Sequence, residues 1–395
     1  MVALKNTSLN FILSTGRTGS TLLSSMLNMH PKILSVSEEP FAYNLYPKYK
    51  NVTNWTDKTI EQFCYDFYLF SEGKLEPQFG KKDDIINLLK EHRSVLTGEN
   101  AIKLAYFAFF PNKDKSQVNT IVDKELKFHH FLNEVADFYP TAKFIMLCRD
   151  PRDNVLVKIK RAIKKKKKPN TFFLAKVWNY EYTTLNKKLS ILDKDRYIKV
   201  KYEDLVEKPE EILKKITSFL NLPYNQVMLN YDENIKEEVK RNESAIGDTV
   251  KQHLSLFHEG LTQKVNTEKV NLWKKELSHE ENDLIWSICE KTALSNGYIA
   301  DGCKTVPYFK PGMIKQLLKF HLDKNLTPYI YYSLPYSIKY FIKKVKYGKN
   351  LKNGTWATRD FYKTTYLPNN SLNLSLIKRG NLLMTLFLAI SLLAR

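Results

Sequence analysis

The chain has 395 residues, of which 43% are hydrophobic and 26% are charged, and its formal net charge is +20. This composition excludes wholesale disorder and allows one large domain with an appendage, or two domains. The positive charge suits nucleic acid, an anionic membrane surface, or a small polyanion such as a nucleotide. Four cysteines, none at CxxC spacing, argue against a zinc ribbon and suit a reducing, cytoplasmic setting.

The first predicted elements are a strand over Leu9–Leu13, a glycine loop over Ser14–Gly19 and a helix over Ser20–Met29. His30-Pro31 ends this helix, because proline removes a hydrogen-bond donor. A second strand is predicted over Ile33–Val36. Residues 41–100 show no clear periodicity, and we expect them to contribute helices and loops around a binding site.

A second group of elements is predicted between residues 128 and 220. Arg149 follows the clearest buried strand of the chain, and Asp153 is expected to cap the helix after it. The predicted elements are a helix over Phe128–Tyr139, a strand over Lys143–Cys148, a helix to about Ile163, a strand over Tyr197–Tyr202 and a helix over Pro209–Leu220.

Strands that alternate with helices predict a mostly parallel central sheet covered by helices on both faces. Ligands of such sheets bind beyond the carboxyl ends of the strands. Ser14–Thr21, Glu38-Glu39 and Arg149 all follow predicted strands. We therefore expect these three segments to share one site.

The loop Ser14-Thr-Gly-Arg-Thr-Gly-Ser-Thr21 has the residues of an anion-binding turn. Gly16 and Gly19 let backbone amides converge on an anion, and the helix N-terminus adds partial positive charge. Arg17 supplies a planar donor fork for phosphate or sulfate oxygens. A lysine after the second glycine, which a Walker A loop needs, is missing, so a nucleotide kinase is the less favoured alternative.

The same loop resembles the 5′-phosphosulfate loop of sulfotransferases that use 3′-phosphoadenosine 5′-phosphosulfate (PAPS). Three further stretches, Phe144–Arg161, Tyr202–Val206 and 265–298, resemble the family's other segments in the family's order. The resemblance covers about residues 9–298 and is closer to the carbohydrate and tyrosylprotein branches, with a glutamate base, than to the cytosolic histidine-base branch. It implies a P-loop NTPase-like three-layer fold.

The resemblance also implies a role for each matching residue. Arg17 would stabilise charge on the bridging oxygen, Arg149 would contact the 3′-phosphate, and Tyr202 would lie beside the nucleotide. PAPS would be the donor and PAP the product, with no metal expected. The acceptor would be a hydroxyl, first of a carbohydrate, with tyrosyl or lipid hydroxyls as alternatives. The residues expected to hold the 5′-phosphosulfate are Thr15, Gly16, Arg17, Thr18, Gly19, Ser20 and Thr21.

An acceptor hydroxyl must lose a proton as it attacks sulfur, so a positioned base is expected. Glu39, directly before Pro40, is the predicted base and Glu38 is the alternative. The histidine pair His129-His130 is interpreted as structural or on the surface.

The chain departs from the family at Val157, where a serine eight residues after the arginine is usual. The second contact to the 3′-phosphate is therefore open, with Lys158, Lys160 or Arg161 as substitutes. If the site does not bind PAPS, the chain would be a catalytically inactive relative that binds nucleic acid or membrane.

Two basic regions remain. The run Lys164–Lys168 is either a solvated loop or a patch that attracts an anionic ligand, and nucleic acid is the least favoured partner.

We place a domain boundary at about Gly302, with a sulfotransferase domain over 1–302 and a basic, aromatic extension over 303–395. Its apolar end, Leu382–Ala394, is too short to span a bilayer and is either a peripheral membrane anchor or a packed helix.

Overall fold

The computed structural model describes residues 4–37, 41–70, 82–107, 113–232, 263–308 and 313–352. Glu38 and Glu39, predicted as the base, lie outside the described residues, and so does Leu382–Ala394.

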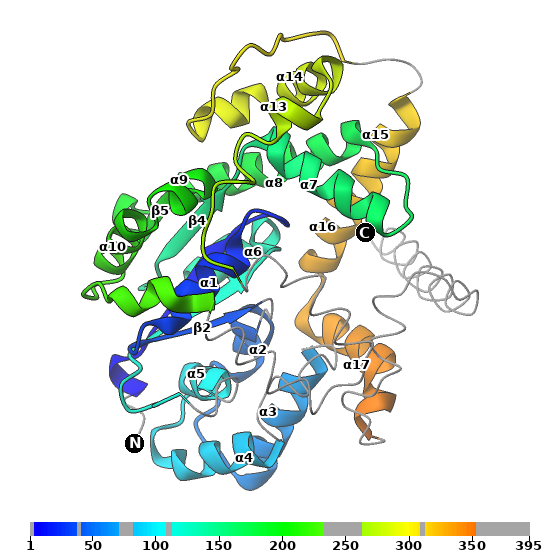
Figure 1. Cartoon of the computed structure of the whole chain (residues 1–395). Helices are drawn as coiled ribbons and strands as arrows, with labels where there is room; N and C mark the ends of the chain where they lie inside the picture. The colour runs from blue at the N-terminus through cyan, green and yellow to red at the C-terminus, as the bar shows by residue number, and fades with distance from the viewer. Residues whose placement is uncertain are drawn as a thin grey trace, which may run out of the picture.

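A five-stranded parallel sheet with the order β2-β3-β1-β4-β5 forms the centre of the molecule (Figure 1). Four strands match the predictions to within one residue at each end. The fifth, β3, was not predicted. The strands are β1 (Ser8–Leu13), β2 (Ile33–Ser37), β3 (Thr120–Glu125), β4 (Phe144–Cys148) and β5 (Tyr197–Lys201).

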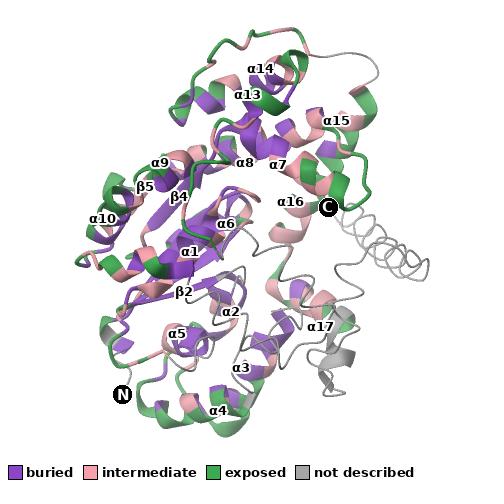
Figure 2. Ribbon diagram, in the orientation of Figure 1, coloured by how far each residue is buried: buried purple, intermediate pink, exposed green. Residues whose placement is uncertain are grey.

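Helices cover both faces of the sheet, which confirms the predicted three-layer α/β fold. Alternate residues of β1 face opposite ways: Phe11 and Leu13 join one buried apolar cluster and Ile12 joins the other. The face of Ile12 is covered by α1 (Ser20–Met29), α9 (Tyr202–Glu207) and α10 (Pro209–Phe219). Figure 2 shows the buried strands between these layers.

The other face carries most of the remaining helices. Residues 41–100 were expected to hold helices and loops, and four α-helices begin in the part of this range that the structure describes; α8 was not predicted at all. These helices are α2 (Phe41–Tyr49), α3 (Asp57–Phe70), α4 (Lys82–Glu91), α5 (Gly98–Phe107), α6 (Phe128–Phe138), α7 (Pro151–Lys164), α8 (Thr171–Leu189), α13 (Trp273–Glu276) and α14 (His279–Ser295).

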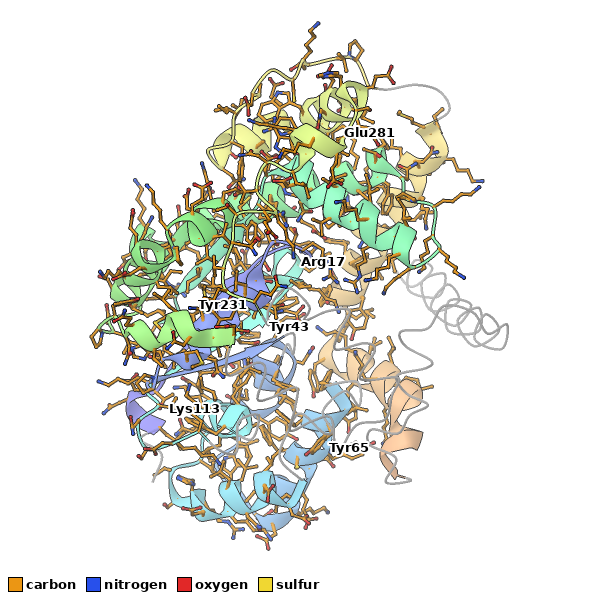
Figure 3. The ribbon with its side chains drawn as sticks, viewed as in Figure 1. Arg17, Tyr43, Tyr65, Lys113, Tyr231 and Glu281 are labelled. Carbon is orange, nitrogen blue, oxygen red and sulfur yellow. The ribbon has the colours of Figure 1, made fainter. Side chains whose placement is uncertain are left out.

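Residues 313–352, which we name the C-terminal strap, run down one side of the molecule in Figure 1. The strap packs on the earlier part of the chain: the Tyr332 ring stacks on His130 with centroids 4.8 Å apart, and Lys339 Nζ donates to the Tyr43 hydroxyl at 2.8 Å. Figure 3 labels Tyr43. The domain boundary at Gly302 stays a prediction. The strap consists of α15 (Ile314–Phe320), a π-helix (His321–Leu326), α16 (Thr327–Ser333) and α17 (Tyr336–Lys352).

The predicted helix cap at Asp153 is wrong by three residues. Asp150 caps α7, because its carboxylate accepts from the Arg152 amide at 2.8 Å and Pro151 takes the first helical position. Asp153 instead lies buried in the first turn, where it accepts from the amides of Asn271 and Trp273 at 2.8 and 3.0 Å. It holds the segment that leads into α13.

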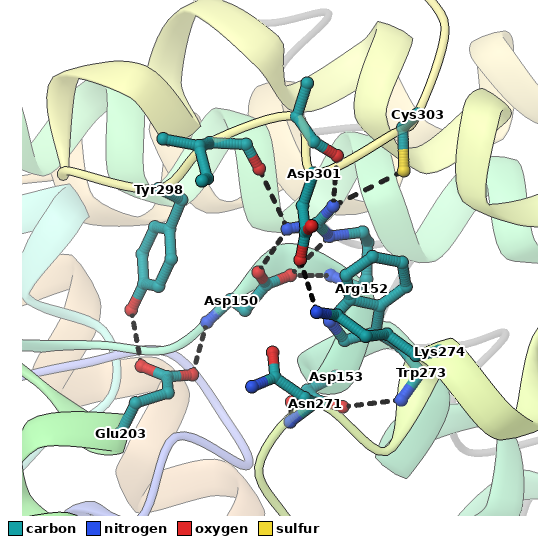
Figure 4. A network of polar contacts seen from close by, with 12 residues as sticks. Asp150, Arg152, Asp153, Glu203, Asn271, Trp273, Lys274, Tyr298, Asp301 and Cys303 are labelled. Atoms are coloured by element: carbon teal, nitrogen blue, oxygen red, sulfur yellow. Dashed lines mark hydrogen bonds and ion pairs between the residues drawn. The ribbon is translucent and has the colours of Figure 1, made fainter.

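Arg152 joins this helix start to the chain around residue 300 (Figure 4). Its guanidinium donates to the Asp150 carboxylate at 2.6 Å and to the carbonyl oxygen of Ala300 at 2.7 Å. It also lies 3.7 Å from the centroid of the Trp273 ring. The side chain is only 2% exposed, so these contacts together replace the water that would otherwise hydrate the guanidinium.

Replacement of the buried Arg152 is expected to destabilise the fold. Arg152→Met should lower the free energy of unfolding by about 3–5 kcal/mol, since it leaves the buried Asp150 carboxylate without its counter-charge. Lys160→Met is the matched control on the same helix: Lys160 pairs with Glu276, but its side chain is 47% exposed, and the loss should stay below about 1 kcal/mol. Equal losses in urea denaturation of the two variants would contradict this assignment.

Candidate functional site

The loop between β1 and α1 has the backbone form of an anion-binding turn. Gly19 directly precedes α1 with a φ of 88°, and Arg17 has a φ of 72°. The left-handed conformation is unfavourable for arginine, so the loop holds Arg17 against its own backbone preference. The first amides of α1, a ten-residue helix, therefore open toward the end of β1.

Neighbouring elements hold this loop from three sides. Asn154 Nδ2 in α7 donates to the carbonyl oxygen of Gly16 at 3.1 Å, and Arg149 Nη1 donates to that of Arg17 at 3.4 Å. The ring of Tyr202 lies against Gly19, where a Cβ would come within 2.4 Å of a ring carbon. The structure thus brings together the loop, Arg149 and Tyr202, as the sequence predicted.

Arg149 is almost completely buried, with 4% of its surface exposed. Its guanidinium lies 4.5 Å from the centroid of the Tyr202 ring and donates to the carbonyl oxygen of Lys269 at 2.6 Å. Its Nε has no hydrogen-bond partner among the described residues. A buried N–H without an acceptor is unfavourable, and an anionic oxygen would satisfy it. The residues present therefore fit a phosphate at this position.

Glu203, the residue after Tyr202, connects β5 to the start of α7 (Figure 4). Its carboxylate accepts from the backbone amide of Asp150 and from the hydroxyl of Tyr298, both at 2.9 Å. Burial raises the pKa of Glu203 from 4.5 to about 7. Glu203 thus ties together the ends of β4 and β5 and the chain after α14.

Sequence reasoning missed Lys124, which lies at the carboxyl end of β3. Its ammonium is 3.2 Å from Thr21 Oγ1 and the residue is 1% exposed. Its neighbour Asp123 is also buried and accepts from the Tyr106 hydroxyl at 2.6 Å. In β3 the short run Thr120-Ile-Val is followed directly by three charged residues, so the sequence lacks the continuous apolar pattern of a buried strand.

Further cations surround the Arg17 end of the loop (labelled in Figure 3). Burial lowers the pKa of Lys158, the charge of Glu181 opposes this shift, and the charges of Lys324 and Arg17 add to it. Burial and the charges of Lys167 and Arg17 lower the pKa of Lys165. Lys160 is paired with Glu276 at 2.5 Å. Of the suggested substitutes for the serine missing at Val157, Lys160 is thus paired with Glu276, and Glu181 is the charged group that acts most strongly on Lys158.

The predicted base follows β2, whose last residue, Ser37, pairs with Lys124. The histidine pair lies in α6 among aromatic rings, with His130 stacked on Tyr332 and the pKa of His130 lowered to about 4 by burial. Among the described residues, no group of three or more His, Cys, Asp or Glu side chains is placed to hold a metal ion.

A sequence model described as "Sulfotransferase family" matches residues 10–226, more than half of the chain. The chain therefore belongs to the sulfotransferase family. This agrees with the glycine loop, the arginine after β4 and the tyrosine after β5 described above.

Individual relatives match shorter stretches. A putative protein-tyrosine sulfotransferase of Caenorhabditis elegans is 33% identical over 115 residues, which cover 29% of this chain and 44% of the relative. Protein-tyrosine sulfotransferase 1 of Danio rerio is 24% identical over 58% of this chain and 57% of the relative. The chain thus spans about half the length of these relatives. A solved sulfotransferase domain from the curacin biosynthetic pathway covers 74% of this chain and 98% of its own, with 20% identity and a TM-score of 0.45.

The two glycines of the loop differ in how much space surrounds them. Gly19→Ala should lower the free energy of unfolding by about 2 kcal/mol or more, because the new methyl group would overlap the Tyr202 ring and φ is positive. Gly16→Ala is the matched control, since nothing lies within 4 Å of its Cβ position, and it should change stability by less than about 1 kcal/mol. Equal losses on chemical denaturation would refute the close contact.

Glu203 predicts a pH dependence of stability. Its pKa in the folded chain is about 7, against 4.5 for the free group, so the folded chain holds a proton that the unfolded chain releases between these values. The stabilisation is complete below pH 4.5 and is lost as pH rises through 7, by up to about 3 kcal/mol. Glu203→Gln cannot titrate, so urea denaturation at pH 5 and 8 should show a smaller decrease for the variant. Parallel stability profiles would show that the carboxyl group titrates normally.

Proposed function

We propose that the chain is an enzyme that transfers a sulfuryl group from PAPS to an acceptor hydroxyl. The observation that carries the proposal is the contact of the β1–α1 loop with Arg149, made directly and through Tyr202. Two predicted anion-binding positions that contact the same tyrosine suit a nucleotide with phosphate groups at both ends. Membership of the sulfotransferase family supports this choice over a nucleotide kinase.

The chain's own groups have separable roles in binding. The loop amides and the hydroxyls of Ser20 and Thr21 would hold the 5′-phosphosulfate at the N-terminus of α1. The unpartnered Nε of Arg149 would donate to the 3′-phosphate. When bound, PAPS supplies an activated sulfuryl group.

Catalysis needs charge stabilisation and a base. Arg17 would stabilise the negative charge that develops on the bridging oxygen as the sulfuryl group leaves, helped by the field of Lys124. A carboxylate at Glu39, or at Glu38, would accept the proton of the attacking hydroxyl. The pairing of Ser37 with Lys124 at the end of β2 supports a base on this side of the loop.

For the acceptor, we propose a tyrosyl hydroxyl of a protein rather than the carbohydrate hydroxyl expected from the sequence. The support is that the relatives described above carry the name protein-tyrosine sulfotransferase. An extended peptide and a sugar differ in shape, so a panel of acceptors separates the two.

The activity test uses labelled PAPS with a tyrosine-containing peptide, its phenylalanine counterpart and a glycan panel. The wild-type chain should label only the tyrosine peptide, and PAP should raise its melting temperature. Arg17→Ala should lower the transfer rate by about 10²–10³-fold, the effect expected from loss of a transition-state donor. Arg93→Ala, which removes an exposed arginine that pairs with Asp57, should retain full activity.

Glu39→Gln or Glu38→Gln should abolish transfer but leave the stabilisation by PAP unchanged, because a base is not needed for binding. Labelling of the glycans alone would replace the tyrosyl acceptor by a carbohydrate. Full activity in both glutamine variants and in Arg17→Ala would remove the mechanism.

A further inference from the structure

The C-terminal strap presents a stripe of apolar side chains to solvent. Ile314, Leu318, Leu322, Leu326 and Tyr329 are 49%, 59%, 53%, 49% and 66% exposed. Phe341 and Val345, one helical turn apart on α17, are 61% and 65% exposed. Seven of the twelve exposed large apolar residues of the described chain thus lie in this one segment. Single exposed apolar residues need no explanation, but an aligned set does.

The stripe is not the inner face of the strap. That face packs on the molecule through Phe320, which is 4% exposed and contacts the rings of Phe173 and Tyr180 on α8. Asn325 accepts from the hydroxyl of Tyr180 at 3.3 Å. The buried and the exposed apolar residues are therefore on different sides of one continuous helical segment, and Figure 2 shows the exposed side of α15 at the edge of the molecule.

The π-helix at His321–Leu326 keeps the stripe in line. On an α-helix, residues four apart are displaced by about 40° around the axis, so a stripe with this spacing would wind away from its starting side. A π-helix places more residues in each turn and rotates the chain less per residue, which offsets the drift. Leu322 and Leu326 consequently remain on the side of Ile314 and Leu318.

The composition of the strap is strongly basic. Residues 313–352 contain nine lysines and one acidic residue, Asp323, which is paired with Lys319 at 2.5 Å; Lys339 is buried against Tyr43 and is not part of this surface. Lys315 and Lys319 are exposed beside the stripe. In a dimer formed through this surface, the lysines of one copy would face the lysines of the other, and their repulsion is unfavourable. Nucleic acid would pair with the lysines but would leave the apolar stripe in water.

We propose that the outer face of the C-terminal strap docks on an anionic lipid bilayer, with the apolar stripe in the headgroup region and the lysines beside lipid phosphates. An exposed apolar stripe with flanking lysines is the pattern of a helix that lies in the membrane interface. No helix among the described residues is long and apolar enough to cross a bilayer, and docking along a surface requires none. This inference is independent of sulfuryl transfer.

The test is co-sedimentation of the full chain with vesicles of phosphatidylcholine containing about 30% phosphatidylserine, and with pure phosphatidylcholine vesicles. The wild-type chain should bind the anionic vesicles, more weakly at high salt, and the neutral vesicles poorly. The double variant Leu318→Ser/Leu322→Ser should bind the anionic vesicles at least about tenfold more weakly. Ile191→Ser/Leu294→Ser is the matched control, since both side chains are exposed elsewhere, and it should bind like the wild type.

Three results would overturn the proposal. The wild-type chain could fail to bind the anionic vesicles. The stripe variant could bind them as well as the wild type, which would assign binding to another region such as Lys164–Lys168. Gel filtration could show a wild-type dimer that the stripe variant abolishes, which would assign the stripe to self-association.

Discussion

The form of the β1–α1 loop depends on contacts from outside it, and the rest of the site depends on that form. Glycine adopts a φ of 88° readily, but arginine at a φ of 72° is unfavourable unless surrounding contacts hold it. Asn154, Arg149 and Tyr202 bind the loop backbone from α7, from the end of β4 and from the end of β5. Arg149 and Tyr202, which would contact one end of a nucleotide, thus also hold the loop that would bind the other end. A substitution of either residue would therefore affect both nucleotide binding and the geometry of the loop.

The sheet order provides this arrangement. With β1 between β3 and β4 and all strands parallel, the loop is bordered by the ends of both neighbouring strands. These ends carry buried charges on each side: Lys124 as the penultimate residue of β3, and Asp150 with Arg152 after β4. Buried charges are tolerated where partners are built around them. Residues 271–303 supply some of these partners, so this part of the chain helps to hold the site.

Patterns of apolar residues predicted four of the five strands and the helix that follows the loop, because those elements bury continuous apolar runs or faces. β3 was not predicted because half of its six residues are charged. Asp123 and Lys124 can lie in the interior because tertiary contacts satisfy their charged groups. The helix cap was assigned to Asp153 although Asp150-Pro151, a capping residue followed by proline, is itself a sequence signal for a helix start. Arg149 and Tyr202 were identified through the resemblance to the sulfotransferase family, and Arg17 through the glycine loop and that resemblance. Asn154 and Glu203 bind backbone groups of distant segments, which no local pattern encodes.

The central claim is that one nucleotide spans the loop and Arg149. Titration calorimetry with PAP and with adenosine 5′-monophosphate, which lacks the 3′-phosphate, tests it most directly in the wild-type chain and in Arg149→Met. The wild-type chain should prefer PAP by at least about tenfold, the value of one charge-assisted contact, and the variant should bind the two ligands equally. An unchanged preference for PAP in the variant would place the 3′-phosphate elsewhere and contradict the account.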